Sequence, residues 1–218
     1  MILYLQQQKN AMDNRRKTLY IGLLIAVVLF LDQAIKFYVK TSYPLDGGFN
    51  MFGQDWAQIK FTENYGMAFG LEFGGRAGKI FLGIFRILAG SGLLYYTFRS
   101  LKEDKRFSFV ISLALITAGA IGNIIDGLFY GVIFSGSTTQ TVAEFLPKNG
   151  GYSSFFDGHV VDMFYFPIID TYWPDWVPWV GGEVLRFNNY IFNFADLSIT
   201  IGVIWIVFLG AFSKKFSL

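Results

Sequence analysis

Apolar stretches that could form bilayer-spanning helices constrain this chain more than any other feature of its sequence. They cover residues 19–39, 76–98 and 107–130, and a fourth begins directly after Asp196 and runs over 197–209. A helix needs about 20 mostly apolar residues to cross the hydrocarbon core of a bilayer. Charged residues make up only 16% of the chain, whereas soluble domains carry about 25%. We therefore expect an α-helical membrane protein with four transmembrane helices.

The distribution of Lys and Arg predicts which side of the membrane each loop faces. Basic residues gather in three places, which are 15–17, 99–106 and 214–215. Basic segments close to membrane helices stay on the cytoplasmic side, so both termini are predicted to be cytoplasmic. We expect a single domain over 1–218, with a polar cytoplasmic tail at 1–17 and extracytoplasmic loops at 41–75 and 131–190.

The first long loop has a pattern that is typical of strands. Apolar and polar residues alternate over 57–62, which predicts short strands lying at the membrane surface. The following segment, 61–70, contains Asn64 and two glycines. By itself, that segment fits a hairpin turn.

Four aspartates are predicted to lie at one level of the membrane. Asp32 is near the end of the first apolar stretch, Asp126 ends the third, Asp196 precedes the fourth, and Asp162 interrupts an apolar run in the loop between the last two. Asn193 is three residues before Asp196, and alone this spacing fits an N-cap pair at the start of a helix. Four acids at one depth are harder to explain as separate helix caps.

Cations also lie within or beside the apolar stretches. Asp32 and Lys36 are one helical turn apart and can form an ion pair. The pair could mark the membrane interface, with Lys36 and Lys40 reaching outward, or it could support a site. Arg86 lies well inside the second stretch, where a guanidinium must face protein, water or a carboxylate.

The inventory of reactive side chains excludes several kinds of chemistry. The chain has no cysteine and one histidine, His159, so it lacks the ligands of a zinc protease and a cysteine nucleophile. No Gly-x-Ser-x-Gly motif accompanies His159. A net charge of +2 gives no reason to expect nucleic acid as a partner, and nothing indicates a cofactor or a metal. Carboxylate chemistry remains, in which two aspartates share a proton and activate water.

Five short blocks, in order, resemble signal peptidase II, the lipoprotein signal peptidase of bacteria. They extend from the first apolar stretch to the last. The blocks are Asp32-Gln-Ala-Ile-Lys36, Asn64-Tyr-Gly-Met-Ala-Phe69, Gly122-Asn-Ile-Ile-Asp126, Val160-Val-Asp162 and Phe192-Asn-Phe-Ala-Asp196. One block alone would be weak, but five in this order are specific.

The resemblance implies an aspartic endopeptidase of the bacterial cytoplasmic (inner) membrane, with Asp162 and Asp196 as the catalytic pair. The substrates would be prolipoproteins already modified with diacylglycerol, cut just before the lipidated cysteine. A small β-crescent formed by 41–75 would hold them against membrane lipids. We expect a monomer. The residues implied to support the pair or contact substrate are Asp32, Lys36, Asn64, Asn123, Asp126 and Asn193.

Two departures from the family pattern affect the expected site. Gly127 stands where the family usually has Arg after Asp126, and 128–157 is an additional segment before the Val-Val-Asp block. We expect Arg86 to replace part of the missing positive charge near Asp126 or Asp32. Binding of Arg86 to backbone carbonyls or water within a helix interface is the alternative. We expect 128–157 to fold near the catalytic pair and touch substrate or lipid, with a detached linker as its alternative.

Two other functions use the same residues. A small proton-coupled carrier could use the acids as a relay, although carriers typically have repeated halves and helices broken at mid-membrane. A membrane scaffold would use the acids only as helix caps. Cleavage of a lipidated precursor by purified protein separates these readings.

Overall fold

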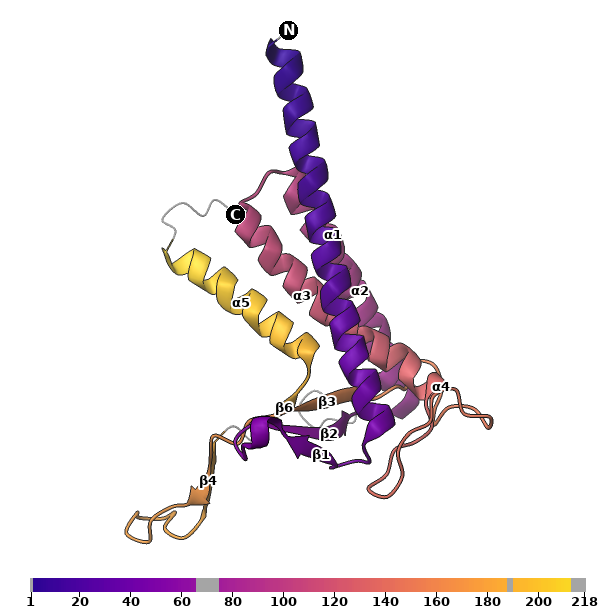
Figure 1. The fold of residues 1–218 in the computed structure, drawn as a ribbon, viewed down its shortest axis with the longest axis vertical. Coiled ribbons are helices and arrows are strands. Elements are labelled where there is room, and N and C mark those ends of the chain that lie inside the picture. Colours follow the sequence, from indigo (N-terminus) through magenta and orange to yellow (C-terminus); the bar gives the residue numbers. More distant parts are fainter. Residues whose placement is uncertain (1, 66–74, 188–189, 213–218) are drawn as a thin grey trace.

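The computed structural model describes residues 2–65, 75–187 and 190–212. Long helices converge at one end on small β-sheets (Figure 1). The long helices are α1 (Ile2–Ser42), α2 (Gly75–Lys102), α3 (Phe107–Ile125) and α5 (Phe194–Phe212). Three of the expected apolar stretches lie within α1, α2 and α5, and the stretch 107–130 continues past the end of α3 through residues 126–130. Helix α1 also continues through the segment 2–17, which we had expected only to be a polar tail.

Helix α3 is the central helix, because it packs against α1, α2 and α5. Apolar side chains on these helices, such as Ile21, Val110 and Ala114, form a buried cluster. Gly122 permits the close approach of α3 to α1, because a Cβ atom there would lie 2.6 Å from Asp32 Oδ2. The helix packing thus brings the carboxylate of Asp32 against the backbone of α3.

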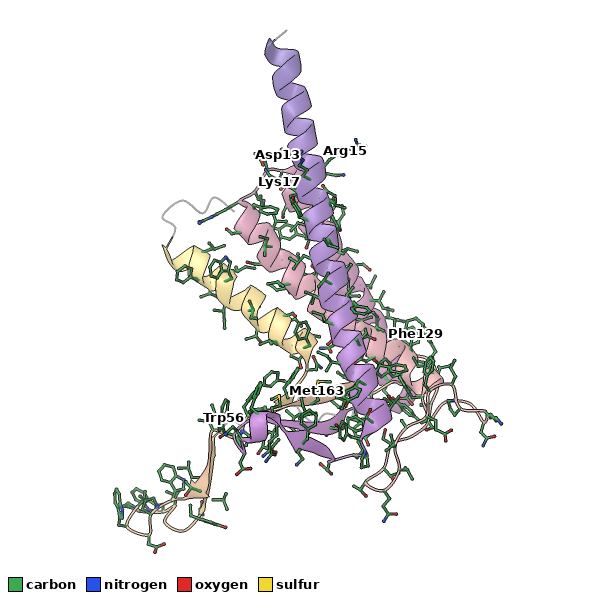
Figure 2. All side chains as sticks on the ribbon, viewed as in Figure 1. Asp13, Arg15, Lys17, Trp56, Phe129 and Met163 are labelled. Atoms are coloured by element: carbon green, nitrogen blue, oxygen red, sulfur yellow. The ribbon has the colours of Figure 1, made fainter. Side chains whose placement is uncertain are left out.

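In the part of the chain that the structure describes, three helical segments are long and apolar enough to cross a membrane: Asp13–Ser42, Gly78–Lys102 and Phe107–Ile133. Helix α5 contributes a shorter apolar segment, Phe194–Gly210. The chain is therefore a helical membrane protein with small antiparallel sheets. The basic cluster at Arg15 and Lys17 lies far from Met163, which is in the sheet (Figure 2).

The larger sheet contains strands from both long loops. Its strands are β1 (Gly48–Asn50), β2 (Gln58–Asn64), β3 (Val160–Tyr165) and β6 (Ile191–Phe192), arranged in the order β1-β2-β3-β6 with antiparallel pairing. Asp162 pairs in register with Thr62. We had expected a crescent made by 41–75 alone, but that loop supplies only β1 and β2.

Residues 61–64 belong to β2, so the predicted turn over this part is wrong. The remainder of the predicted turn, 66–70, lies outside the described residues. A short 3-10 helix, η1 (Met51–Gly53), connects β1 to the segment before β2. A second sheet is the antiparallel hairpin of β4 (Ile169–Tyr172) and β5 (Val184–Phe187).

The additional segment 128–157 packs against the rest of the protein. After α3 the chain continues through a π-helical turn, η3 (Asp126–Tyr130), and the short helix α4 (Gly131–Ile133). Phe134 is then fully buried in a cluster with Val39, Phe61 and Met163. The segment therefore joins α1 to the larger sheet, which argues against a detached linker.

Candidate active site

The start of α5 confirms the expected N-cap pair. The backbone N–H of Asp196 donates to Asn193 Oδ1 at 2.9 Å, and the N–H of Asn193 donates to Asp196 Oδ2 at 3.3 Å. This reciprocal arrangement is a capping box, and it satisfies backbone donors that a helix leaves unpaired at its first turn. Capping therefore fixes the position and orientation of the Asp196 carboxylate.

The same Asn193 side chain connects the two predicted catalytic aspartates. Its Nδ2 donates to Asp162 Oδ1 at 2.7 Å and to Asn123 Oδ1 at 3.1 Å. Asn123 in turn donates from Nδ2 to Asp196 Oδ1 at 2.9 Å. Two amides from different helices thus hold the carboxylates of Asp162 and Asp196 as neighbours.

Asp162 has the electrostatic environment of an acid that retains its proton. Its side chain lies on β3 and is only 4% exposed. Burial and the nearby Asp196 carboxylate raise the pKa of Asp162 to about 7, although hydrogen bonds from Asn193 and Asn64 act in the opposite direction. Burial and a like charge both disfavour the ionised form of a carboxyl. A proton on Asp162 therefore stabilises this pair of acids near neutral pH.

Lys36 links the pair to the two remaining aspartates. Its Nζ lies 2.9 Å from Asp32 Oδ2 and 2.7 Å from Asp126 Oδ2, and it donates to Asn123 Oδ1 at 2.8 Å. The three partners match the three N–H donors of an ammonium group. Lys36 and Lys40 are both fully buried, so the alternative in which they reach outward is wrong.

Asp32 also fixes the helix that carries Asp196. Its Oδ1 accepts a hydrogen bond from the backbone N–H of Ala195 at 2.8 Å. Asp126 Oδ2 similarly accepts from the N–H of Val161, the residue before Asp162, at 3.3 Å. Both acids therefore position the backbone next to a predicted catalytic aspartate.

Gln33 is a connection that the sequence reasoning missed. Its Nε2 donates to Asp126 Oδ1 at 2.9 Å and to Asp32 Oδ2 at 3.1 Å, and its Oε1 accepts from Tyr130 at 3.2 Å. Gln33 lies inside the block that contains Asp32 and Lys36. Its position between Asp32 and Lys36 in the sequence was the one feature that could have indicated a role for Gln33 in the site.

The sequence also did not predict a second buried ion-pair cluster. Lys40 pairs with Glu63, which accepts from Ser137 at 3.0 Å and lies 2.8 Å from His159 Nδ1. Burial alone would raise the pKa of Glu63, but His159 and Lys40 lower it to about 2. The cluster joins α1 to β2, the strand that ends in Asn64, and Ser137 adds the segment 128–157 to it.

Arg86 lies beside the residue that departs from the family pattern. A Cβ atom on Gly127 would be 3.8 Å from Arg86 Nη1. Arg86 and Gly127 line one pocket together with Asn123, Lys79 and Tyr65. The guanidinium of Arg86 is therefore next to the position that a side chain at residue 127 would occupy. The same pocket is lined by Asn123, whose side-chain amide donates a hydrogen bond to Asp196.

The site joins two carboxylates at one end of apolar helices, which is the arrangement of a membrane-embedded aspartic hydrolase. Within the described ranges, no group of three or more His, Asp or Glu residues is placed to hold a metal ion. The contacts described above join six of the predicted supporting residues to this network, which are Asp32, Lys36, Asn64, Asn123, Asp126 and Asn193.

Comparisons with known proteins agree with this class. The family described as signal peptidase (SPase) II matches residues 24–212. The lipoprotein signal peptidase of Porphyromonas gingivalis is 48% identical over 185 residues, covering 84% of this chain and 79% of the relative. That of Amoebophilus asiaticus is 35% identical over 187 residues, covering 84% and 73%.

A solved structure described as a bacterial membrane enzyme shares the fold. It superposes with a TM-score of 0.58 at 23% identity, covering 90% of this chain and 94% of that one. The chain belongs to the signal peptidase II family, and it is an aspartic protease. The family consists of bacterial membrane enzymes that act on prolipoproteins. The comparisons give no support to a proton-coupled carrier.

Proposed function

We propose that this protein cleaves the signal peptide from diacylglyceryl-modified prolipoproteins, just before the lipidated cysteine, with Asp162 and Asp196 as its catalytic pair. The observation that carries the proposal is the shared amide of Asn193, which bonds Asp162 and also caps the helix whose first turn contains Asp196. Family membership indicates the substrate class, and the geometry indicates the pair.

In the proposed mechanism, the two aspartates share one proton, and Asp162, whose pKa is raised to about 7, carries it in the resting enzyme. Asp196 removes a proton from water, whose oxygen attacks the carbonyl carbon of the scissile peptide bond. Asp162 donates its proton to the carbonyl oxygen as the tetrahedral intermediate forms. Collapse of the intermediate breaks the C–N bond as Asp196 passes its proton to the leaving amine. One hydroxyl of the intermediate returns a proton to Asp162, which restores the resting pair. Dyads that share a proton divide acid and base work in this way.

The remaining site residues hold or complete the pair in this proposal. Asn123 and Asn193 orient the carboxylates, while Lys36 and its partners Asp32 and Asp126 keep both backbones in place. A hydrogen bond from Asn64 to Asp162 places the end of β2 at the site, where we propose that it also contacts substrate. Arg86 supplies positive charge to the neighbouring pocket.

We also propose the placement of the protein in the cell. The chain crosses the bacterial inner membrane four times as a monomer, with both termini in the cytoplasm and Asp162 and Asp196 on the extracytoplasmic side. The distance between the basic cluster near Arg15 and the sheet that contains Met163 supports this orientation (Figure 2). Lipid would surround the apolar helices.

Cleavage of a defined precursor tests the function directly. Purified protein in phospholipid vesicles is mixed with a prolipoprotein peptide, either with or without diacylglycerol on its lipobox cysteine. Mass spectrometry should show a product that begins at the lipidated cysteine, and the unmodified peptide should remain intact. Equal cleavage of both peptides would overturn the proposed substrate class. Absence of cleavage of the lipidated peptide by well-folded protein would overturn the function.

A further inference from the structure

The β4–β5 hairpin has an ordered tip, formed by residues 173–183. The N–H of Trp173 donates to the carbonyl oxygen of Glu183 at 2.8 Å, and the N–H of Gly182 donates back to the carbonyl oxygen of Trp173 at 3.0 Å. Further backbone bonds within the tip, from Val177 to Pro174 and from Gly181 to Val177, are each 3.0 Å long. The tip is thus a defined surface, and the hairpin extends away from the larger sheet (Figure 1).

Large aromatic side chains project from this ordered tip. Trp176 is 81% exposed and Trp179 is 97% exposed, and Tyr172 at the end of β4 is also exposed. Indole and phenol rings combine an apolar body with a polar edge, so they favour places where one end can be apolar and the other hydrated. The boundary between lipid chains and water is such a place.

Two of the exposed rings belong to residues with an unusual backbone conformation. Trp179 and Phe52 are, among the described residues, the two most exposed large apolar side chains, at 97% and 88%. Both have left-handed backbones, with φ of 67° and 57° respectively. Bulky residues rarely adopt this conformation, and such positions are concentrated at binding sites. The same combination of exposure and strain thus occurs on the hairpin and on η1.

Ring contacts connect the η1 region to the base of the hairpin. The ring centroids of Trp56 and Phe166 are 6.5 Å apart, and those of Phe166 and Phe192 are 5.7 Å apart. Trp56 lies at the edge of the larger sheet where the chain leaves for β4 (Figure 2). Aromatic residues therefore extend from the larger sheet towards the hairpin.

Charge excludes an anionic partner for the tip. No Lys or Arg occurs between Tyr165 and Arg186, whereas Asp175 and Glu183 are both exposed. A surface of this kind cannot attract phosphate groups or acidic peptides by charge. A neutral layer that accepts aromatic rings fits it better, and the bilayer around the helices provides that layer.

We propose that the hairpin tip and Phe52 insert into the interfacial layer of the bilayer on the side where the larger sheet lies. Trp176, Trp179 and Phe52 are the inserted rings, and the partner is zwitterionic phospholipid. The hairpin joins the strand of Asp162 to the helix of Asp196, so insertion would fix the sheet and the site at a set height above the lipid chains. This proposal rests on membrane residence and does not depend on the catalytic assignment.

Fluorescence quenching by brominated lipids tests the insertion. The full chain is placed in phosphatidylcholine vesicles brominated either near the headgroup end or near the methyl end of the acyl chains. We expect a component of tryptophan emission that shallow bromines quench more strongly, and the Trp176→Phe/Trp179→Phe variant should lose it. Trp205→Phe, in α5, is the matched control and should leave that component in place.

A labelled cysteine gives an independent measurement, because the chain contains no native cysteine. A spin label on Trp179→Cys should be more accessible to oxygen and less accessible to a water-soluble nickel complex than a label on Lys148→Cys. Leu88→Cys in α2 is the reference within the membrane. The proposal is overturned if the Trp179→Cys label is as accessible to nickel as the Lys148→Cys label. It is also overturned if lipid contact appears only after prolipoprotein is added, or only at high protein-to-lipid ratio.

Discussion

Asn193 performs two tasks that proteins usually give to separate residues. Its carbonyl oxygen caps α5, and its amide nitrogen bonds both Asp162 and Asn123. Ser, Thr or Asp would serve as a helix cap about as well. None of them offers both an acceptor for the cap and two N–H donors. Asn193 can therefore cap α5 and also take part in the site, so helix capping and a functional role are compatible interpretations of the Asn193–Asp196 spacing.

Substitution of either aspartate tests the proposed pair at the scale of one residue. Asp162→Asn and Asp196→Asn should each lower the single-turnover cleavage rate by at least ~10²-fold, because the loss of one proton-transfer role typically has an effect of that size. Asp126→Asn should be milder, since it positions Val161 and Lys36 and transfers no proton. Helix content and thermal unfolding in vesicles are the controls. Near-normal cleavage by either dyad variant would contradict the assignment.

The raised pKa of Asp162, about 7, predicts how cleavage and stability change with pH. A dyad that needs one shared proton should lose activity as the pH rises past about 7, and the two limbs of the profile belong to the pair. The folded protein also holds a proton that the unfolded chain, with an ordinary value of 3.8, releases. Stability from this group should therefore fall as the pH rises from about 4 to about 7.

Rate profiles and thermal unfolding across that range measure both effects. Asp162→Asn cannot ionise, so its stability should lack this component of the pH dependence. A cleavage rate that stays constant from pH 5 to pH 9 would contradict a shared proton.

Arg86 and Gly127 provide a test of charge replacement. Arg86→Leu should reduce cleavage about tenfold, which corresponds to about 1.4 kcal/mol, because it removes the positive charge from a pocket that Asn123 also lines. Adding Gly127→Arg should restore part of the rate, since the two positions border the same space. Arg86→Lys, which retains the charge, is the matched control. An unaffected Arg86→Leu enzyme would show that the pocket needs no guanidinium.

Individual residues also show what the sequence could predict and what it could not. The spacing of Asn193 and Asp196 predicted the cap correctly, because both lie within one helical turn. Gln33 and Asp126 are 93 positions apart, so no local pattern could show their contact. Lys40 near the end of a helix resembles an outward-reaching lysine, but Glu63 from a distant strand retains it in the interior.

Among the secondary-structure elements, the helices could be predicted from the sequence, whereas the larger sheet could be predicted only in part. Apolar stretches of sufficient length predict helices in a membrane, since the backbone must satisfy its own hydrogen bonds there. Strand β2 was indicated by the alternation over 57–62. Its partner β3, and β6 which pairs with β3, come from a loop about 100 residues away. Pairing between distant strands depends on tertiary packing, which local patterns do not encode.

The segment 128–157 offers a stability prediction. Phe134 is 0% exposed between α1 and the larger sheet, so Phe134→Ala should lower the free energy of unfolding by about 3–5 kcal/mol. Phe145, which is 47% exposed, is the matched control, and Phe145→Ala should have a much smaller effect. Thermal unfolding in vesicles measures both. Equal losses of stability in Phe134→Ala and Phe145→Ala would show that burial of Phe134 does not stabilise the protein.

At the scale of the whole molecule, the orientation in the membrane is the main prediction. The chain has no cysteine, so single cysteines report their side without background. In right-side-out membranes, an impermeant maleimide should label Lys148→Cys at once and Lys102→Cys only after permeabilisation. The reverse pattern would overturn the predicted orientation, and labelling of both at once would overturn the predicted number of crossings.

The pairing of β3 with β6 has a consequence for how this protein can vary. Phe164 pairs with Phe192 and Tyr165 with Ile191. After leaving the end of β3, the chain therefore comes back to pair with β3 before it reaches Asn193. The segment between Tyr165 and Ile191 is a loop whose two ends are held together by the pairing of β3 with β6. Lengthening such a loop twofold adds only about 0.6 kcal/mol of closure entropy. The hairpin can thus be lengthened, trimmed or exchanged among relatives while the distance between the two aspartates stays constant.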